Sequence, residues 1–133
     1  MAKKTVFISF DYDNDAYWKN LLLAWDKHND FDFGFYDGSL KDAINSTNAA
    51  YIKSQIKPKI LAAGRLLCIV GETTSKSAWI DWEIQTAKDA SKKLIGVKTA
   101  KDNTSPSGLL GIFGTKWALS FNFDAIKKAI DES

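Results

Sequence analysis

Short apolar runs alternate with amphipathic stretches along most of this chain. The apolar runs are rich in β-branched and aromatic residues, as strands are, and the amphipathic stretches repeat with helical spacing. The pattern predicts strands at 5–10, 31–36, 65–70, 94–98 and 118–121, and helices at 14–28, 50–63, 77–91 and 124–130. Such alternation is typical of right-handed βαβ units, which build a parallel sheet. We therefore predict the α/β class, as a flavodoxin-like three-layer sandwich with a five-stranded parallel sheet of order 2-1-3-4-5, formed by residues 1–133 as a single domain.

Local signals mark the ends of these elements. Asn14 is a good N-cap for the first helix, and Pro58 conflicts with the interior of the second and would kink it. Residues 40–50 are polar and irregular, which indicates a loop. Residues 99–115 also read as a loop, with a short apolar patch within it.

Composition narrows the possible functions. Apolar residues make up 45% of the 133 residues, enough for one core, and 18 basic and 16 acidic residues give a net charge of +2. This balance predicts no nucleic-acid partner and no membrane partner. The single Cys (Cys68, inside an apolar strand) and single His (His28, near a helix end) argue against a disulfide framework, a metal site and a Cys–His couple. With no signal peptide and no long apolar run, a cytoplasmic location is expected.

Glu83 stands out because it falls on the apolar side of its own predicted helix, 77–91. On a helical wheel, one arc holds Trp79, Ile80, Ile84, Ala87 and Ala90, and the opposite side holds Asp81, Gln85, Lys88 and Asp89. A buried carboxylate is costly unless a partner satisfies it, and its pKa is raised. Acid–base and cation-stabilising carboxylates are commonly presented in this way. The alternative is a glutamate at the edge of the packed face with its head in solvent.

The predicted topology points to the same place. In a sheet of this order, ligands bind outside the carboxyl ends of strands 1 and 3. The first of these ends carries Phe10-Asp-Tyr-Asp13, and the second carries Gly71-Glu-Thr-Thr74, which leads into the helix of Glu83. We therefore expect Glu83 in the wall of a ligand crevice.

Two common uses of this fold do not fit the sequence. Asp11, Asp13 and Asp15 follow the first strand, where a flavodoxin needs a phosphate-binding loop. A receiver domain needs a phosphoacceptor Asp after the third strand, which here ends Cys68-Ile-Val-Gly71. The acidic triplet fits either solvated loop and N-cap chemistry or substrate contact.

Three segments carry a family resemblance. They are the opening strand Thr5-Val-Phe-Ile-Ser-Phe-Asp11, the turn Tyr36-Asp-Gly-Ser-Leu40, and Ser77-Ala-Trp-Ile-Asp-Trp-Glu-Ile84, in which a Trp precedes a Glu by four residues. In this order they resemble the boxes of Toll/interleukin-1 receptor (TIR) domains, in particular the small bacterial TIR-like proteins of antiphage defence systems such as Thoeris. The resemblance spans about residues 4 to 98.

The resemblance implies an NAD⁺-cleaving signalling enzyme, with Glu83 as its catalytic residue and NAD⁺ as substrate rather than cofactor. Cleavage would release nicotinamide and produce an ADP-ribose-derived messenger, linear or cyclic, that reaches an effector in antiphage defence. The chemistry suits a desolvated carboxylate, because breaking the nicotinamide–ribose bond creates an oxocarbenium-like centre. Nicotinamide leaves readily, so no strong general acid is needed.

Around Glu83 we expect six substrate-binding side chains: Phe10, Asp11, Asp37, Ser75, Ser77 and Trp79. The phenyl ring would stack on a flat ring, the two aspartates would hold ribose hydroxyls, and the serines near a helix N-terminus would contact phosphate. The indole would pack beneath Glu83 and exclude water. Two alternatives stay open: Ser77 as only an N-cap and Trp79 as only a core residue.

Two other functions fit the same residues. One is a non-catalytic interaction module that acts through TIR–TIR self-association, a contact that enzymatic TIR domains often also need to complete their sites. The other is a sensor that binds a nucleotide without cleaving it.

Overall fold

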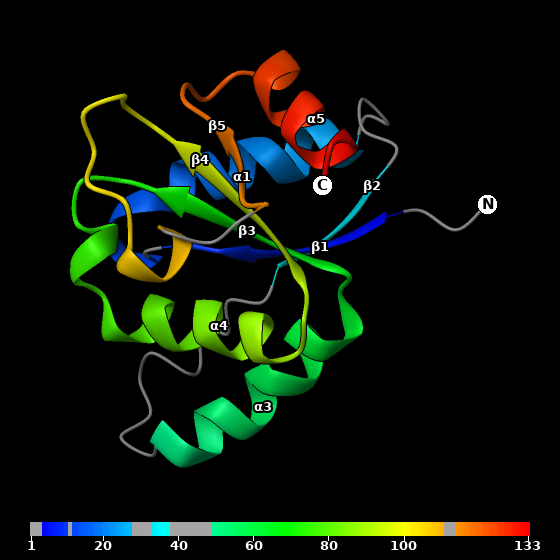
Figure 1. Ribbon diagram of the computed structural model, residues 1–133, viewed down its shortest axis with the longest axis vertical. Coiled ribbons are helices and arrows are strands. Elements are labelled where there is room, and N and C mark those ends of the chain that lie inside the picture. Colours follow the sequence, from blue (N-terminus) through cyan, green and yellow to red (C-terminus); the bar gives the residue numbers. More distant parts are fainter. Residues whose placement is uncertain (1–3, 11, 28–32, 38–48, 111–113) are drawn as a thin grey trace.

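The described part of the computed structural model, residues 4–10, 12–27, 33–37, 49–110 and 114–133, forms a layered α/β domain (Figure 1). Within these residues, five parallel strands make one sheet of order β2-β1-β3-β4-β5. The strands are β1 (Lys4–Ser9), β2 (Phe33–Asp37), β3 (Arg65–Val70), β4 (Lys93–Lys98) and β5 (Lys116–Ala118). The predicted α/β class with a parallel sheet is confirmed, and the strands follow the predicted order.

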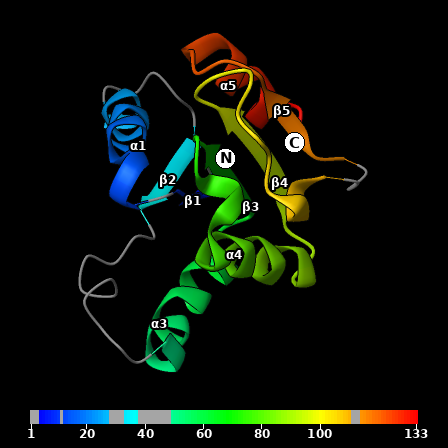
Figure 2. The ribbon, with the colours of Figure 1, turned by 90° about the vertical axis from the view of Figure 1, so that its left-hand side faces the viewer.

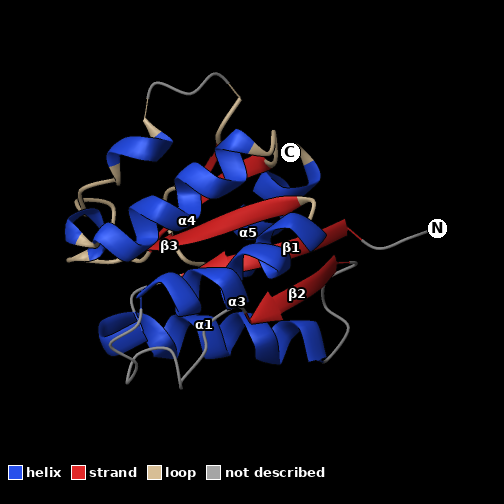
Figure 3. Ribbon diagram, turned by 90° about the horizontal axis from the view of Figure 1, so that it is seen from below, coloured by secondary structure: helices blue, strands red, loops and turns tan. Residues whose placement is uncertain are grey.

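Helices cover both faces of the sheet (Figures 2 and 3). The helices are α1 (Tyr12–Lys27), α3 (Ala49–Ala62), α4 (Ala78–Asp89) and α5 (Phe123–Asp131), and the short 3₁₀ turns are η1 (Thr74–Lys76) and η2 (Ser107–Leu109). One core lies between the sheet and α1 with α5, and a second lies between the sheet and α3 with α4. No helix among the described residues is long and apolar enough to cross a membrane.

The alternation of side chains along β1 decides which core each residue joins. Val6 and Ile8 pack on the side of α1 and α5, and Phe7 packs on the side of α3 and α4. Successive side chains of a strand point to opposite faces of the sheet. Ser9 therefore follows Phe7 and meets α4.

The predicted N-cap of the first helix and the predicted position of the fifth strand were wrong. Helix α1 begins at Tyr12, so Asn14 lies inside the helix rather than at its N-cap; a local capping preference is weak next to tertiary packing. Strand β5 occupies Lys116–Ala118 instead of 118–121, because Trp117 packs against Gly96 of β4 and leaves Leu119 56% exposed.

Other loop and helix signals had mixed outcomes. Helix α3 runs through Pro58. Most of the predicted loop at 40–50 lies outside the described residues. The predicted loop at 99–115 contains η2, whose Leu109 is buried against the core of α3 and α4.

The contact between Gly96 and Trp117 gives a test of how β5 is held. A Cβ at Gly96 would lie 2.6 Å from Trp117 Cε3 and closer still to Cζ3. We expect Gly96→Ala to lower the free energy of unfolding by about 1–3 kcal/mol, measured by urea denaturation. The matched control is Gly64→Ala, where the nearest atom lies 3.8 Å from an added Cβ, and it should change stability by less than about 1 kcal/mol. Equal losses in the two variants would contradict the packing described.

Candidate functional site

Glu83 is buried on the inner face of α4. Glu83 is only 7% exposed, and it shares the buried face of the helix with Ile80, Ile84 and Ala87. The prediction that Glu83 lies on the packed face is confirmed, and the alternative with its head in solvent is wrong. The helix therefore carries a carboxylate into the interior of the protein.

Ser9 is the hydrogen-bond partner of Glu83. The Ser9 hydroxyl donates to Glu83 Oε1 at 3.0 Å, and Ser9 itself is 1% exposed. Ser9 ends β1 and pairs in register with Cys68 of β3, so the contact lies at the carboxyl end of β1 and in the carboxyl-terminal half of β3. In the part of the chain that the structure describes, Oε2 accepts no hydrogen bond, which leaves it available to a ligand.

Burial controls the ionisation of Glu83. Removal from water raises the pKa of this carboxyl from 4.5 to about 8, and the hydrogen bond from Ser9 acts in the opposite direction. A carboxyl with a pKa near 8 is mostly protonated at neutral pH when no ligand is bound. An adjacent positive charge would stabilise the ionised form and lower the pKa.

Asp15 is a second buried carboxylate near this end of the sheet. It lies in the first turns of α1, is 5% exposed, and accepts a hydrogen bond from the Thr74 hydroxyl at Oδ2 (3.3 Å). From the sequence, the triplet that includes Asp15 fitted either solvated loop and N-cap chemistry or substrate contact. The same signal that singled out Glu83 would have found it, because Asp15 precedes Trp18 by three and Leu22 by seven residues on the apolar stripe of α1.

Cys68 lies near both carboxylates. It is fully buried in the core of α3 and α4, and burial raises the pKa of its thiol far above the ordinary value, with further contributions from Glu83 and then Asp15. The thiol therefore stays protonated and acts as a core residue, as predicted. No group of His, Cys, Asp and Glu in the described ranges is arranged to hold a metal ion.

The predicted aromatic contacts lie on two different sides of the site. Phe10 is 7% exposed and packs in the core of α1 and α5, where Lys19 Nζ lies 5.6 Å from the centre of its ring. Ser9, by contrast, faces α4. The structure therefore does not bring Phe10 to the same side of β1 as Glu83.

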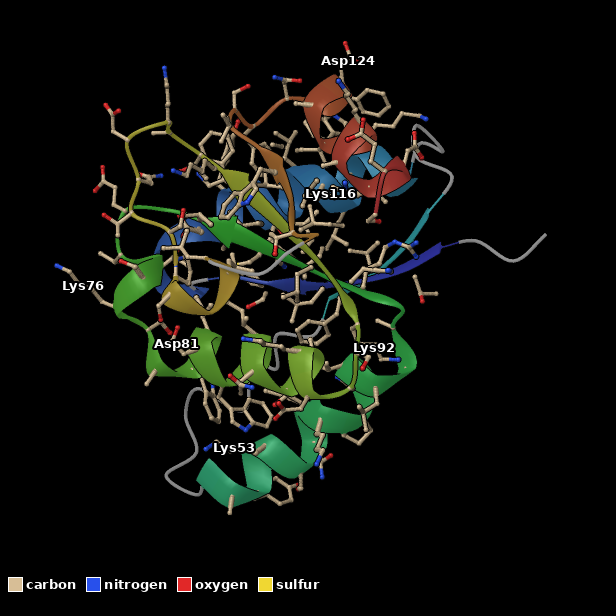
Figure 4. The ribbon with its side chains drawn as sticks, viewed as in Figure 1. Lys53, Lys76, Asp81, Lys92, Lys116 and Asp124 are labelled. Carbon is tan, nitrogen blue, oxygen red and sulfur yellow. The ribbon has the colours of Figure 1, made fainter. Side chains whose placement is uncertain are left out.

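Trp79 packs on the core of α3 and α4. Its ring stacks on that of Trp82, with centroids 5.6 Å apart, and Lys53 Nζ of α3 lies 5.7 Å from the Trp79 ring and 5.5 Å from the Trp82 ring. Figure 4 shows Lys53 reaching from α3 towards α4. Trp79 thus joins the two helices on this side of the sheet.

The structure describes three of the four remaining predicted contacts, Ser77, Ser75 and Asp37. The Ser77 hydroxyl accepts a hydrogen bond from the Ile80 amide at 3.2 Å, which confirms its role as N-cap of α4. Ser75 is half-buried in η1, and Asp37 is the last residue of β2, paired in register with Ile8. Asp11 lies outside the described residues.

Comparisons with known proteins bear on both family and fold. A family model described as "Thoeris protein ThsB, TIR-like domain" matches residues 7–104. No curated protein sequence matches the chain. Among solved structures, a protein described as "2-desoxiribosyltransferase from Leishmania mexicana" is similar, with a TM-score of 0.58, 18% identity and 97% of each chain covered. At that identity the likeness shows the fold alone.

The raised pKa of Glu83 predicts how stability depends on pH. Between pH 4.5 and about 8 the folded protein holds a proton on Glu83 that the unfolded chain has lost, so the free energy of unfolding falls as pH rises through this window. Glu83→Gln has no proton to lose in this window. The free energy of unfolding of the variant minus that of the wild type should therefore rise across the window by up to about 5 kcal/mol. Urea denaturation at several pH values measures the difference. The control Asp81→Asn changes an exposed carboxylate of the same helix and should run parallel to the wild type; a parallel curve for Glu83→Gln would contradict the burial described.

Proposed function

Since the chain belongs to the family of the TIR-like domain of the Thoeris protein ThsB, we propose that it is an NAD⁺-cleaving signalling enzyme of antiphage defence. In this proposal it breaks the bond between nicotinamide and ribose and produces an ADP-ribose-derived messenger, linear or cyclic. NAD⁺ is the substrate, and no further cofactor takes part. The messenger then reaches an effector.

The observation that carries the proposal is the buried carboxylate of Glu83. It lies at the carboxyl ends of β1 and β3, where parallel α/β sheets bind ligands, and only Oε1 is engaged by a described residue. A structural carboxylate in a core is ordinarily paired with a cation or with several donors. Among the described residues, Glu83 has one neutral donor, which supports a role towards a ligand instead.

The proposed reaction uses this carboxylate as an electrostatic stabiliser. As the bond from ribose C1′ to the nicotinamide nitrogen breaks, its electron pair goes to the pyridinium ring, which leaves as neutral nicotinamide. Positive charge develops at C1′ and the ring oxygen, and an ionised Glu83 stabilises it in a site with little water. Water or a hydroxyl of the product then adds to C1′ and loses its proton to solvent.

The substrate itself promotes ionisation of Glu83. The nicotinamide ring of NAD⁺ carries a positive charge, and a cation near a buried carboxyl lowers its pKa. A group that is mostly protonated in the free protein therefore becomes charged when the substrate binds. This coupling gives the site a preference for the oxidised, cationic cofactor form over the neutral reduced form.

The other contacts remain proposals. Ser75 near the start of α4 is proposed to contact the diphosphate, and Asp37 and Asp11 to hold ribose hydroxyls. Trp79, whose ring packs on the core of α3 and α4, is proposed to border the site by excluding water near α4. Phe10 is left out of the proposed contacts, because its ring packs in the core of α1 and α5. Self-association through TIR–TIR contacts is proposed to complete the site.

The first test is NAD⁺ consumption by concentrated protein, with products separated by mass. We expect the wild type to release nicotinamide, and Glu83→Gln to lose activity by about a hundredfold or more because charge stabilisation is the main catalytic effect. Asp81→Asn, a change of the same kind on the exposed side of α4, should keep wild-type activity. A folded Glu83→Gln protein with full turnover contradicts the proposal. A wild type that leaves NAD⁺ intact even when assembled favours a non-catalytic interaction module, and saturable binding without cleavage favours a nucleotide sensor.

The second test is the pH dependence of cleavage. We expect kcat/KM to rise with pH and to reach half of its maximum near pH 8, the pKa of the free carboxyl. The corresponding midpoint for kcat should be lower, because bound NAD⁺ favours the ionised form. Ser9→Ala removes the hydrogen bond that lowers this pKa, so its kcat/KM midpoint should move to higher pH. Ser54→Ala removes another serine hydrogen bond, to the Tyr51 carbonyl in α3, and should leave the profile unchanged. Identical profiles for wild type and Ser9→Ala would refute the role of Ser9.

A further inference from the structure

The Thr74 hydroxyl connects Asp15 to the segment that leads into α4. The Thr74 hydroxyl lies 3.3 Å from Asp15 Oδ2, and the Gly71 amide donates to the same hydroxyl at 2.8 Å. Thr74 is fully buried, and its hydroxyl also lies 3.3 Å from the Ile69 carbonyl of β3. The Thr74 side chain therefore joins helix α1, strand β3 and turn η1.

Gly71 leaves room for the Asp15 carboxylate. A Cβ at Gly71 would lie 2.6 Å from Asp15 Cγ and closer still to both carboxylate oxygens, so any other residue would displace the carboxylate. Gly71 has no positive φ, so a glycine is needed here because it has no side chain to collide with Asp15, and not because of its backbone freedom. The first residue after β3 is thus fitted to Asp15.

The same segment sets the start of α4. The Ser77 amide donates to the Thr74 carbonyl at 3.1 Å, and Ser77 then caps the helix by accepting from the Ile80 amide. Glu83 follows on the next turn and meets Ser9 of β1. Hydrogen bonds therefore link Asp15 to Thr74 and Thr74 to Ser77, and helix α4 itself connects Ser77 to Glu83.

We infer that Asp15 is a positioning residue: its carboxylate, seated over Gly71 and bound by Thr74, holds the start of helix α4 so that Glu83 reaches the carboxyl ends of β1 and β3. The inference rests on the proposed function for its effect on catalysis. Its effect on the environment of Glu83 does not depend on that function. Asp15 acts through α4, so a change at Asp15 should alter the rate of the chemical step more than the binding of the substrate.

Three variants test the inference. Thr74→Val removes the hydroxyl and keeps the Asp15 side chain, Gly71→Ala displaces that side chain without removing it, and Asp15→Ala removes it. Thr74→Ser keeps the hydroxyl and serves as the rescue variant, and Thr104→Val is the matched control at an exposed threonine. Thermal unfolding of every variant separates a loss of fold from a loss of position.

The kinetic readout is the split between kcat and KM for NAD⁺. We expect Thr74→Val, Gly71→Ala and Asp15→Ala each to lower kcat by about tenfold or more with KM within about threefold, and Thr74→Ser to recover most of kcat. Adding Gly71→Ala to Asp15→Ala should cause no further loss, because the displaced group is already gone. Losses that multiply in the double variant, or three folded variants with wild-type kcat, would overturn the inference.

The second readout needs no activity. The chain has only three glutamates, Glu72, Glu83 and Glu132, so a ¹³C spectrum of glutamate carboxyls resolves Glu83, assigned by its absence in Glu83→Gln. We expect its titration midpoint to move by about half a pH unit or more in Thr74→Val and in Gly71→Ala, and to stay at the wild-type value in Thr74→Ser and Thr104→Val. If wild-type protein does not cleave NAD⁺, the proposed function fails and this titration alone decides. An unchanged midpoint in the folded variants refutes the positioning role.

Discussion

The hydrogen bond from Ser9 to Glu83 is the interaction on which the proposed chemistry depends. It joins the end of β1 to the middle of α4, between the sheet and its helix layer. Among the described residues, Ser9 is the hydrogen-bond donor to the buried Glu83 carboxyl. One neutral hydroxyl offsets only part of the desolvation cost, which is why the pKa of Glu83 stays near 8. The two cores that cover the sheet supply the stability that tolerates this cost. Because one described residue donates to Glu83, Oε2 is available to a ligand, and a nearby cation can change the ionisation of the carboxyl.

The parallel sheet explains why two buried carboxylates from different helices lie at one end of the domain. All five described strands run in the same direction, so the loops after β1 and β3 meet at the same edge. Helix α1 begins directly after β1 and brings Asp15 to that edge, and α4 follows β3 and brings Glu83. Their roles differ with their surroundings. Asp15 packs over Gly71 and accepts a hydrogen bond from Thr74, whereas Glu83 Oε2 accepts no hydrogen bond from a described residue.

Much of the fold was predictable because its signals are local and repeated. Apolar runs and helical spacing identified the strands and helices, and α/β alternation led to the parallel sheet. The errors fell where a contact distant in sequence decides the outcome. Strand β5 is placed by the packing of Trp117 on Gly96. These residues belong to two neighbouring strands, and no local sequence pattern connects them. The side of β1 on which Phe10 lies depended on the register of the strand, because a shift of one residue moves every side chain to the opposite face.

By itself, the sequence determined that Glu83 lies on the packed face of its helix, that Ser77 caps that helix, and that a single cysteine leaves no disulfide within the chain. These conclusions follow from periodicity and composition, which act over a few residues or over the whole chain. Only the tertiary structure decided that Ser9 is the partner of Glu83, 74 positions away, and that Asp15 belongs with Gly71 and Thr74. Such pairings are set by which strand ends and helix starts meet in space, and one helix or strand read alone carries no information about its neighbours.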